Sequence, residues 1–185
     1  AETAALKHQS LHDELTGLPN RVLLDNELAA AISAVQAKKK GLSLLYLDLD
    51  RFQVINDTFG YRWGDFLLQQ VVPRLQGALR KADTVARVNG GDEFAVILPN
   101  IGDASGAVRI ARRLLHLLEP PFQIEGHRVG LSASIGIGLC PEHGTDADTL
   151  LRRAALAVHQ AKRTGVGYAL YSPEQEEVYN PTRLL

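Results

Sequence analysis

The chain has 185 residues, of which 45% are hydrophobic and 22% are charged, and its formal net charge is −1. This length suffices for one buried core in a single domain with short tails, and the near-neutral charge argues against a nucleic-acid-binding protein. The single cysteine excludes an internal disulfide, and no stretch approaches the ~20 apolar residues that a membrane helix needs. We therefore expect a cytoplasmic domain without direct membrane insertion.

A helix is predicted over residues 20–38, because its apolar residues recur at helical spacing and share one face. These residues are Leu24, Leu28, Ile32 and Val35. Gly41 is expected to end this helix, since glycine is the residue that most often follows a helix.

Residues 42–47 have the length and the mainly apolar composition of a buried strand, which ends at Asp48 and Asp50. Side chains alternate along a strand, so these two carboxylates are expected on the same side. A loop is expected next, followed by a helix that Pro73 should kink. The apolar stripe of that helix consists of Leu68, Val72, Leu75 and Leu79.

The second half of the chain continues the alternation of strands and helices. Residues 84–99 are predicted to form a β-hairpin, and a second hairpin is predicted over residues 122–139, with its turn at Glu125 and Gly126. Asp103 is expected to cap a helix over residues 104–118, and Asp146 is expected to cap a helix that runs to about Thr164. Residues 168–172 are predicted to be an edge strand. Tight hairpins within such an alternation predict an α+β fold, an α/β sandwich with a mainly antiparallel or mixed sheet packed against helices.

Two acidic pairs stand near predicted strand ends, Asp48 with Asp50 and Asp92 with Glu93. If those strands are neighbours, the carboxylates converge, and such like charges repel unless a cation lies among them. Mg²⁺ prefers oxygen ligands and also binds substrate phosphates. An ordinary hairpin turn and a common strand ending explain the same residues, so this pattern alone leaves both interpretations open.

The segment "RVNGGDEFAVIL" resembles the signature of the GGDEF family, the diguanylate cyclases. Enzymes of this family condense two GTP molecules into cyclic di-GMP and release pyrophosphate. Four further segments resemble family motifs in the same order: "DELTGLPNR", "DLDRFQVINDTFGYRWGDFLL", "SASIGIGL" and "AALAVHQAKRTG". The likeness covers about residues 10–172. It implies a central five-stranded sheet wrapped by helices, similar to nucleotidyl cyclases and polymerase palm domains.

The resemblance also implies roles for individual residues. The metal, Mg²⁺ or Mn²⁺, would be bound by Asp48, the backbone carbonyl of Leu49, Asp92 and Glu93. Asp92 and Glu93 would also be catalytic, with Glu93 helping to deprotonate the attacking 3′-hydroxyl. The residues expected to bind GTP are Asn56 and Asp65 at the guanine, and Arg51, Phe52, Gly90, Gly91 and Lys162 at the phosphates.

One such domain binds one GTP, so the resemblance implies that catalysis takes place across a homodimer. Arg80 and Asp83 match the spacing of an inhibitory site for cyclic di-GMP in this family. The same spacing is also typical of a solvated ion pair near a helix end.

The sequence departs from the family pattern at several positions. Two residues, Val88 and Asn89, separate the arginine from the first glycine, where the family usually has one. The added residue is expected either to form a bulge or to shift the strand register, which would reverse the side-chain faces. Gln53 and Val166 stand where the family prefers lysine and arginine, which should weaken the binding of phosphates. The alternative is therefore a catalytically weak module that binds GTP or cyclic di-GMP.

The chain contains no methionine, and we expect it to be a piece of a longer protein. Residues 1–12 would be an incoming signalling helix or linker and residues 13–172 the GGDEF domain. Residues 173–185 resemble the linker toward an EAL phosphodiesterase domain. In that arrangement the domain would act with a covalently attached sensor and EAL domain, and it would regulate the phosphodiesterase if it were inactive. The full-length protein could be anchored in a membrane outside this segment.

Overall fold

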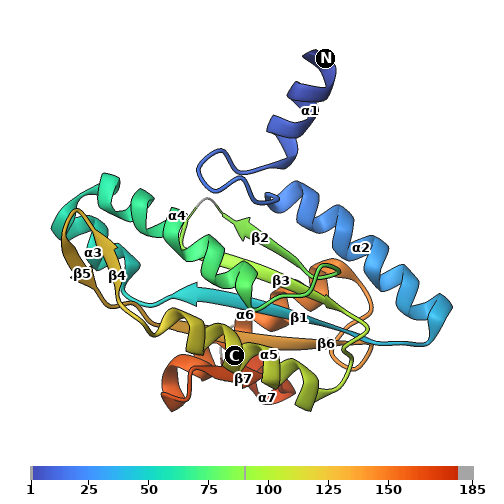
Figure 1. Cartoon of the computed structure of the whole chain (residues 1–185). Helices are drawn as coiled ribbons and strands as arrows, with labels where there is room; N and C mark the ends of the chain where they lie inside the picture. Colours follow the sequence, from blue (N-terminus) through green and yellow to red (C-terminus); the bar gives the residue numbers. More distant parts are fainter. Residues whose placement is uncertain (1, 90, 179–185) are drawn as a thin grey trace.

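A computed structural model describes residues 2–89 and 91–178 (Figure 1). The central sheet has five strands in the order β2-β3-β1-β6-β7. Their bounds are β1 Leu42–Leu49, β2 Thr84–Val88, β3 Glu93–Pro99, β6 Ala133–Cys140 and β7 Tyr168–Leu170. Neighbouring strands are antiparallel except β6 and β7, which are parallel. The predicted α+β fold with a mainly antiparallel sheet is confirmed.

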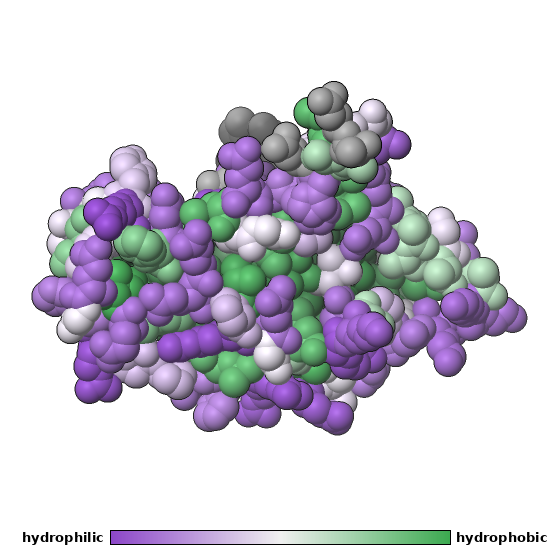
Figure 2. Space-filling view, turned by 45° about the horizontal axis from the view of Figure 1, so that its top comes forward, coloured by the Kyte–Doolittle hydropathy of each residue, from purple (hydrophilic) through white to green (hydrophobic). Residues whose placement is uncertain are grey.

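Four long helices cover the two faces of this sheet. Helices α2, Arg21–Lys38, and α6, Ala147–Thr164, pack with one set of strand residues, and α4, Tyr61–Gly77, and α5, Ala104–Leu118, pack with the other. The two sets alternate along β1, as the strand geometry requires: Leu44 and Tyr46 face one cluster, and Leu45 and Leu47 face the other. Figure 2 shows that hydrophobic side chains on the face in view are surrounded by hydrophilic ones.

Short elements complete the fold, and several of them differ from the predictions. The expected loop after β1 contains helix α3, Phe52–Phe59, and the second hairpin is a separate two-stranded sheet of β4, Phe122–Ile124, and β5, His127–Val129. The chain begins with α1, Glu2–Leu11, which projects away from the sheet in Figure 1. Helix α7, Pro173–Val178, forms part of the expected C-terminal linker, and residues 179–185 lie outside the described residues.

Helix termini follow the predicted caps in most cases. The side chain of Asp103 accepts a hydrogen bond from the backbone of Gly106, and that of Asp146 accepts one from Thr149. Gly41 does not end α2, because Lys39 already takes the left-handed conformation there with φ 54°. A Cβ on Gly41 would lie 2.8 Å from the Cα of Gly102, so this glycine permits two loops to pack closely. The helix α4 continues through Pro73.

The register of β1 determines where the acids lie. Asp48 pairs with Glu93 on β3 and with Ser134 on β6. The site therefore lies where β1 ends, between its two neighbours β3 and β6, and this place is called the sheet edge. On the hairpin, Val88 pairs with Glu93 and Arg87 with Phe94. The two strands therefore pair in a continuous register without a β-bulge. The extra residue lies in the turn between them. Within the described residues, no helix is both long and apolar enough to cross a membrane.

Candidate active site

Asp48 and Asp92 bring two carboxylates into contact at this sheet edge. Asp48 belongs to β1, and Asp92 precedes β3, where its carbonyl accepts a hydrogen bond of 3.0 Å from the backbone N–H of Leu49. Burial raises the pKa of Asp92, and the charge of Asp48 and a hydrogen bond between the two side chains raise it further. Two carboxylates this close favour a nearby positive charge.

Lys162, near the end of α6, faces the same pair. Its Nζ lies 2.6 Å from Oδ2 of Asp48. Burial lowers the pKa of Lys162, but the hydrogen bond to Asp48 and the charges of Asp48, Asp50 and Asp92 outweigh it, so the pKa is raised overall. The lysine remains charged and is directed at the acids from an element 114 residues away.

Glu93 is held by two residues that the sequence did not single out for this purpose. Its Oε2 accepts a hydrogen bond of 2.7 Å from the hydroxyl of Tyr46 and one of 2.8 Å from Nδ2 of Asn89. Tyr46 lies two residues before Asp48, so alternation places it on the same face, and this was the available signal. Asn89 takes a left-handed conformation in the turn, with φ 58°.

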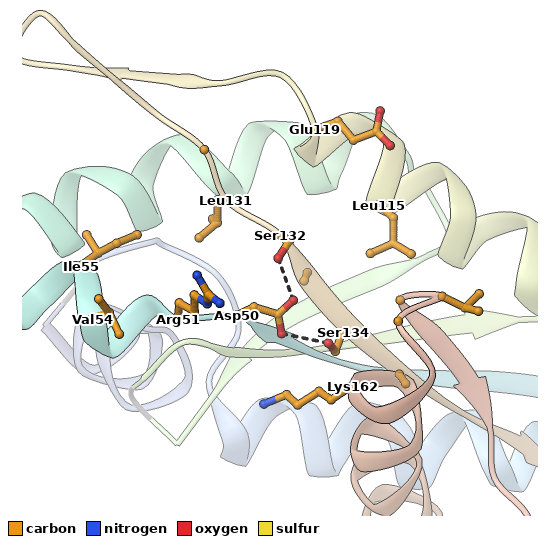
Figure 3. Close-up of a pocket in the computed structure, with 16 residues that line it drawn as sticks. Asp50, Arg51, Val54, Ile55, Leu115, Glu119, Leu131, Ser132, Ser134 and Lys162 are labelled. Atoms are coloured by element: carbon orange, nitrogen blue, oxygen red, sulfur yellow. Dashed lines mark hydrogen bonds between the residues drawn. The ribbon is translucent and has the colours of Figure 1, made fainter.

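Asp50 does not join the other acids. Its two oxygens accept hydrogen bonds of 2.8 Å from the hydroxyls of Ser132 and Ser134 (Figure 3). It therefore ties the end of β1 to β6. Of the three or four carboxylates expected to converge, Asp48, Asp92 and Glu93 lie together, and Asp50 is bonded to the two serines instead.

The donors present fit a magnesium ion. Among the described residues, no group of three or more His, Cys, Asp or Glu side chains forms a metal cage. Two carboxylates and a backbone carbonyl are nevertheless enough for Mg²⁺, which keeps several waters and shares its coordination with substrate phosphates. The position of Asp92 next to the end of β1 favours a cation here, and burial together with the charge of Asp48 raises the pKa of Asp92 accordingly.

A cavity of about 1040 Å³ opens next to these acids. Arg51 and Lys162, both predicted to meet phosphates, line it, together with Asp50 and Val166 (Figure 3). The side chain of Phe52 is buried at the start of α3, whereas the predicted phosphate contact is through the backbone N–H groups near this residue. The wall does not include the carboxylates of Asp48 and Asp92 or the predicted guanine-binding residues. Of the residues predicted to meet phosphates, the cavity wall thus contains Arg51 and Lys162.

The predicted guanine-binding residues lie on α3 and α4. Asp65 directly follows Gly64 on α4, and Asn56 approaches Gly64 from α3. A Cβ on Gly64 would lie only 1.8 Å from Oδ1 of Asn56. That oxygen is buried and has no hydrogen-bond partner among the described residues. A buried polar atom without a partner is unfavourable, so a ligand that donates a hydrogen bond would stabilise it. Asp65 is exposed.

Arg87 fastens the turn of the hairpin to the N-terminal part of the chain. Its Nη1 lies 3.1 Å from both carboxylate oxygens of Asp13, and its Nε donates a 2.9 Å hydrogen bond to the carbonyl of Gly91. Asp13 and Arg87 lie in two of the segments that resemble family motifs, "DELTGLPNR" and "RVNGGDEFAVIL". The contact between these two segments was not predicted. Gly91 is not among the residues with positive φ, and Gly90 lies outside the described residues.

Arg80 and Asp83 form an internal ion pair. Nη2 of Arg80 lies 2.6 Å from Oδ1 of Asp83 and donates a 2.8 Å hydrogen bond to the carbonyl of Pro99. The carboxylate of Asp83 is fully buried, while the arginine is half-exposed. A cavity of about 470 Å³ lies beside the pair. The fold thus brings Arg80 and Asp83 together, and the guanidinium of Arg80 is hydrogen-bonded within the domain.

The sequence and fold of this chain match a known protein family. Residues 10–167 match the sequence model of the family described as "Diguanylate cyclase, GGDEF domain", and the chain belongs to this family. It is a GGDEF domain of the kind found in cyclic di-GMP signalling proteins.

Individual relatives support this assignment. The chain is 40% identical over 167 residues to the diguanylate cyclase TpbB of Pseudomonas aeruginosa, covering 90% of this chain and 38% of that protein. It is 40% identical over 163 residues to the bifunctional diguanylate cyclase/cyclic di-GMP phosphodiesterase MucR of the same species, covering 88% of this chain and 24% of that protein. A solved GGDEF domain of TpbB superposes with a TM-score of 0.86 at 37% identity, covering 90% of this chain and 98% of that one. The chain therefore spans well under half the length of these two curated relatives.

Proposed function

We propose that this domain condenses two GTP molecules into cyclic di-GMP, as a homodimer and with Mg²⁺ or Mn²⁺ as cofactor. One observation carries the proposal: the carboxylates of Asp48 and Asp92 are in contact at one sheet edge, with Lys162 beside them. This combination of acids and a lysine suits a metal and a triphosphate bound together.

The metal would be held by Asp48, Asp92, Glu93 and the carbonyl of Leu49. When bound, such a cation offsets the charge of the leaving pyrophosphate and makes the 3′-hydroxyl a better nucleophile. Asp92 and Glu93 would be the catalytic acids, and Glu93 would accept the proton of the 3′-hydroxyl. The hydrogen bonds that Glu93 receives fix its carboxylate in place before the substrate arrives.

The guanine of GTP would bind at Asn56 and Asp65, and its phosphates would bind near the start of α3. The buried Oδ1 of Asn56 would accept a hydrogen bond from guanine, with Asp65 as the second acceptor. No side chain caps α3 among the described residues, so the backbone N–H groups near Arg51 and Phe52 are available to phosphate. Lys162, and Gly90 with Gly91 in the turn, would complete the phosphate site.

The test measures cyclic di-GMP formed from GTP and Mg²⁺ by the domain held as a dimer through a fused dimerisation helix. Asp92→Ala is expected to abolish product formation, because it removes a metal ligand. Asp148→Ala, at an exposed acid in the first turn of α6, is the control and is expected to be fully active. Absence of product both from the wild-type forced dimer and from the full-length protein would contradict the proposal.

A second function is favoured by two side chains near the phosphate site. Gln53 bonds to Asp57 on its own helix, and Val166 is 59% exposed at the cavity beside Lys162. Neither supplies a positive charge to phosphate. The domain would then be a weakly active or inactive module that binds GTP or cyclic di-GMP and controls an attached EAL phosphodiesterase. Calorimetric titrations in which neither nucleotide binds more tightly than millimolar would reject this alternative.

The same proposal extends to regulation and to the rest of the protein. Cyclic di-GMP would bind at Arg80 and Asp83, which requires Arg80 to leave its bond with Pro99. Residues 1–12 would transmit the signal of an attached sensor, residues 13–172 would form the GGDEF unit, and residues 173–185 would lead to an EAL domain. The domain would work in the cytoplasm.

A further inference from the structure

Asn89 occupies a specific position in the turn between β2 and β3. It follows Val88, the last paired residue of β2, and it is the residue by which this turn exceeds the family signature. Its backbone is left-handed with φ 58°, a conformation that asparagine tolerates better than most residues. The turn thus directs the side-chain amide of Asn89 back over the hairpin toward Glu93.

The amide joins a closed group of three polar side chains. Nδ2 of Asn89 lies 2.8 Å from Oε2 of Glu93 and 3.2 Å from the hydroxyl of Tyr46, and that hydroxyl lies 2.7 Å from the same Oε2. Tyr46 is only 7% exposed, so its ring is fixed by packing against the core. Both donors use Oε2 of Glu93, and among the described residues no hydrogen bond to Oε1 occurs.

The location of this group connects it to the reaction. Glu93 pairs with Asp48 across β3 and β1, and it directly follows Asp92. A carboxylate with free rotamers must lose that freedom when it binds a metal, whereas a carboxylate already held by donors does not. Hydrogen bonds to a charged group are also stronger than those between neutral groups.

We propose that Asn89 is a positioning residue for catalysis: together with Tyr46 it holds Glu93 so that Oε1 is presented to the metal and the 3′-hydroxyl. This inference rests on the proposed function. The added turn residue is then an anchor for the catalytic acid and not merely a tolerated insertion.

Two substitutions separate the amide from the backbone conformation. Asn89→Gly keeps the left-handed φ and removes the donor, and Asn89→Asp keeps the shape but places a second carboxylate against Glu93. Asn100→Gly is the matched control, because Asn100 is an exposed asparagine with φ 64° at the other end of β3. Tyr46→Phe removes the second donor to Glu93.

The deciding measurement is the affinity of Mn²⁺ for the domain in complex with 3′-deoxy-GTP, followed by electron paramagnetic resonance. This nucleotide lacks the attacking hydroxyl and does not turn over. Asn89→Gly is expected to weaken Mn²⁺ binding by about tenfold, the size expected for one charge-assisted hydrogen bond. Tyr46→Phe should have a similar effect, the double variant should lose less than the product of the two, and Asn100→Gly should bind as the wild type does.

Turnover by the forced dimer supplies a second readout. In Asn89→Gly, kcat should fall by about tenfold while KM for GTP changes by less than about twofold, and Asn89→Asp should lose more because of charge repulsion. Mn²⁺ affinity within twofold of the wild type in both Asn89 variants would overturn the inference, whatever their activity. If neither the wild-type forced dimer nor the full-length protein makes product, the proposed function fails, and the Mn²⁺ titration then decides only whether Asn89 positions Glu93 for the metal.

Discussion

Gly64 shows how a single missing side chain can leave room for a neighbouring polar side chain, here that of Asn56. It lies in α4 opposite Asn56, and a methyl group there would overlap Oδ1 of Asn56 at 1.8 Å. That carbonyl oxygen is one of the few buried side-chain atoms without a partner in the described part of the chain. The close approach of α3 and α4 therefore keeps Asn56 unpaired and buried until a ligand arrives.

We expect Gly64→Ala to displace Asn56 and to raise KM for GTP by about tenfold, the loss expected for one hydrogen bond with a base edge. Gly77→Ala is the control in the same helix, because a Cβ there meets only Leu117, at 3.9 Å. That control should retain its KM and its stability. Steady-state kinetics with circular dichroism melts of both variants test this. An unchanged KM in folded Gly64→Ala would contradict the role of Asn56.

The repulsion at Asp92 should be visible in the stability of the metal-free domain. The pKa of Asp92 is raised above its ordinary value of 3.8, so the folded state binds its proton more tightly than the unfolded state does. Stability from this group is present below the ordinary pKa and is lost as the pH rises through the raised one. Ionised Asp92 is therefore destabilising at neutral pH.

The substitution Asp92→Asn should accordingly raise the free energy of unfolding at pH 7 in the absence of metal. The difference in unfolding free energy between the variant and the wild type should shrink as the pH is lowered toward 4. The reason is that the wild-type carboxyl takes up a proton and loses its charge. Urea unfolding at several pH values measures this difference. A variant that is less stable than the wild type at pH 7 would show that the two acids do not repel each other.

At the scale of elements, the hairpin that carries the signature is anchored by Arg87. The guanidinium bonds to Asp13 in the N-terminal loop and to the carbonyl of Gly91 in the turn. The side chains of Arg87 and Asp13 are only 9% and 17% exposed, so solvent screens this pair weakly. The segment that follows α1 is thereby joined directly to the turn.

Asp13→Asn should lower the free energy of unfolding by about 1–3 kcal/mol, since it replaces a charged acceptor of a largely buried guanidinium with a neutral one. Product formation should also fall, because the turn loses its anchor. Asp25→Asn is the control: the exposed pair of Asp25 with Arg21 should contribute no more than about 0.5 kcal/mol. Chemical unfolding of both variants provides the comparison, and equal losses would argue against a special role for Asp13.

The elements that local signals define were predicted well, and those that depend on distant partners were not. Apolar spacing located α2, and the acids Asp103 and Asp146 marked the starts of α5 and α6. The short helix α3 was missed, because eight residues after a strand give little periodicity. Strand β6 was assigned to a hairpin with its sequence neighbours, whereas it pairs with β1, about ninety residues earlier.

At the scale of the molecule, the site is assembled from segments far apart in the chain. Sequence patterns identified the acids and Lys162, because a family signature marks them. The partners of Glu93 were missed, since Tyr46 looks like an ordinary core residue and Asn89 like an ordinary turn residue. Their contact depends on the register between β1 and β3, which local patterns do not specify.

The ion pair of Lys162 with Asp48 has a consequence for how the ligands bind. In the free domain the ammonium group already serves as the counterion of Asp48, at 2.6 Å. A metal that takes this place must displace the lysine, and a triphosphate gives the displaced lysine a new partner. Metal and nucleotide should therefore bind with positive cooperativity, each weakly alone. We expect Lys162→Ala to tighten Mn²⁺ binding without nucleotide and to weaken GTP binding, so that the cooperativity seen in calorimetry disappears. The lysine thus acts as a stand-in for the metal, released only when both ligands arrive.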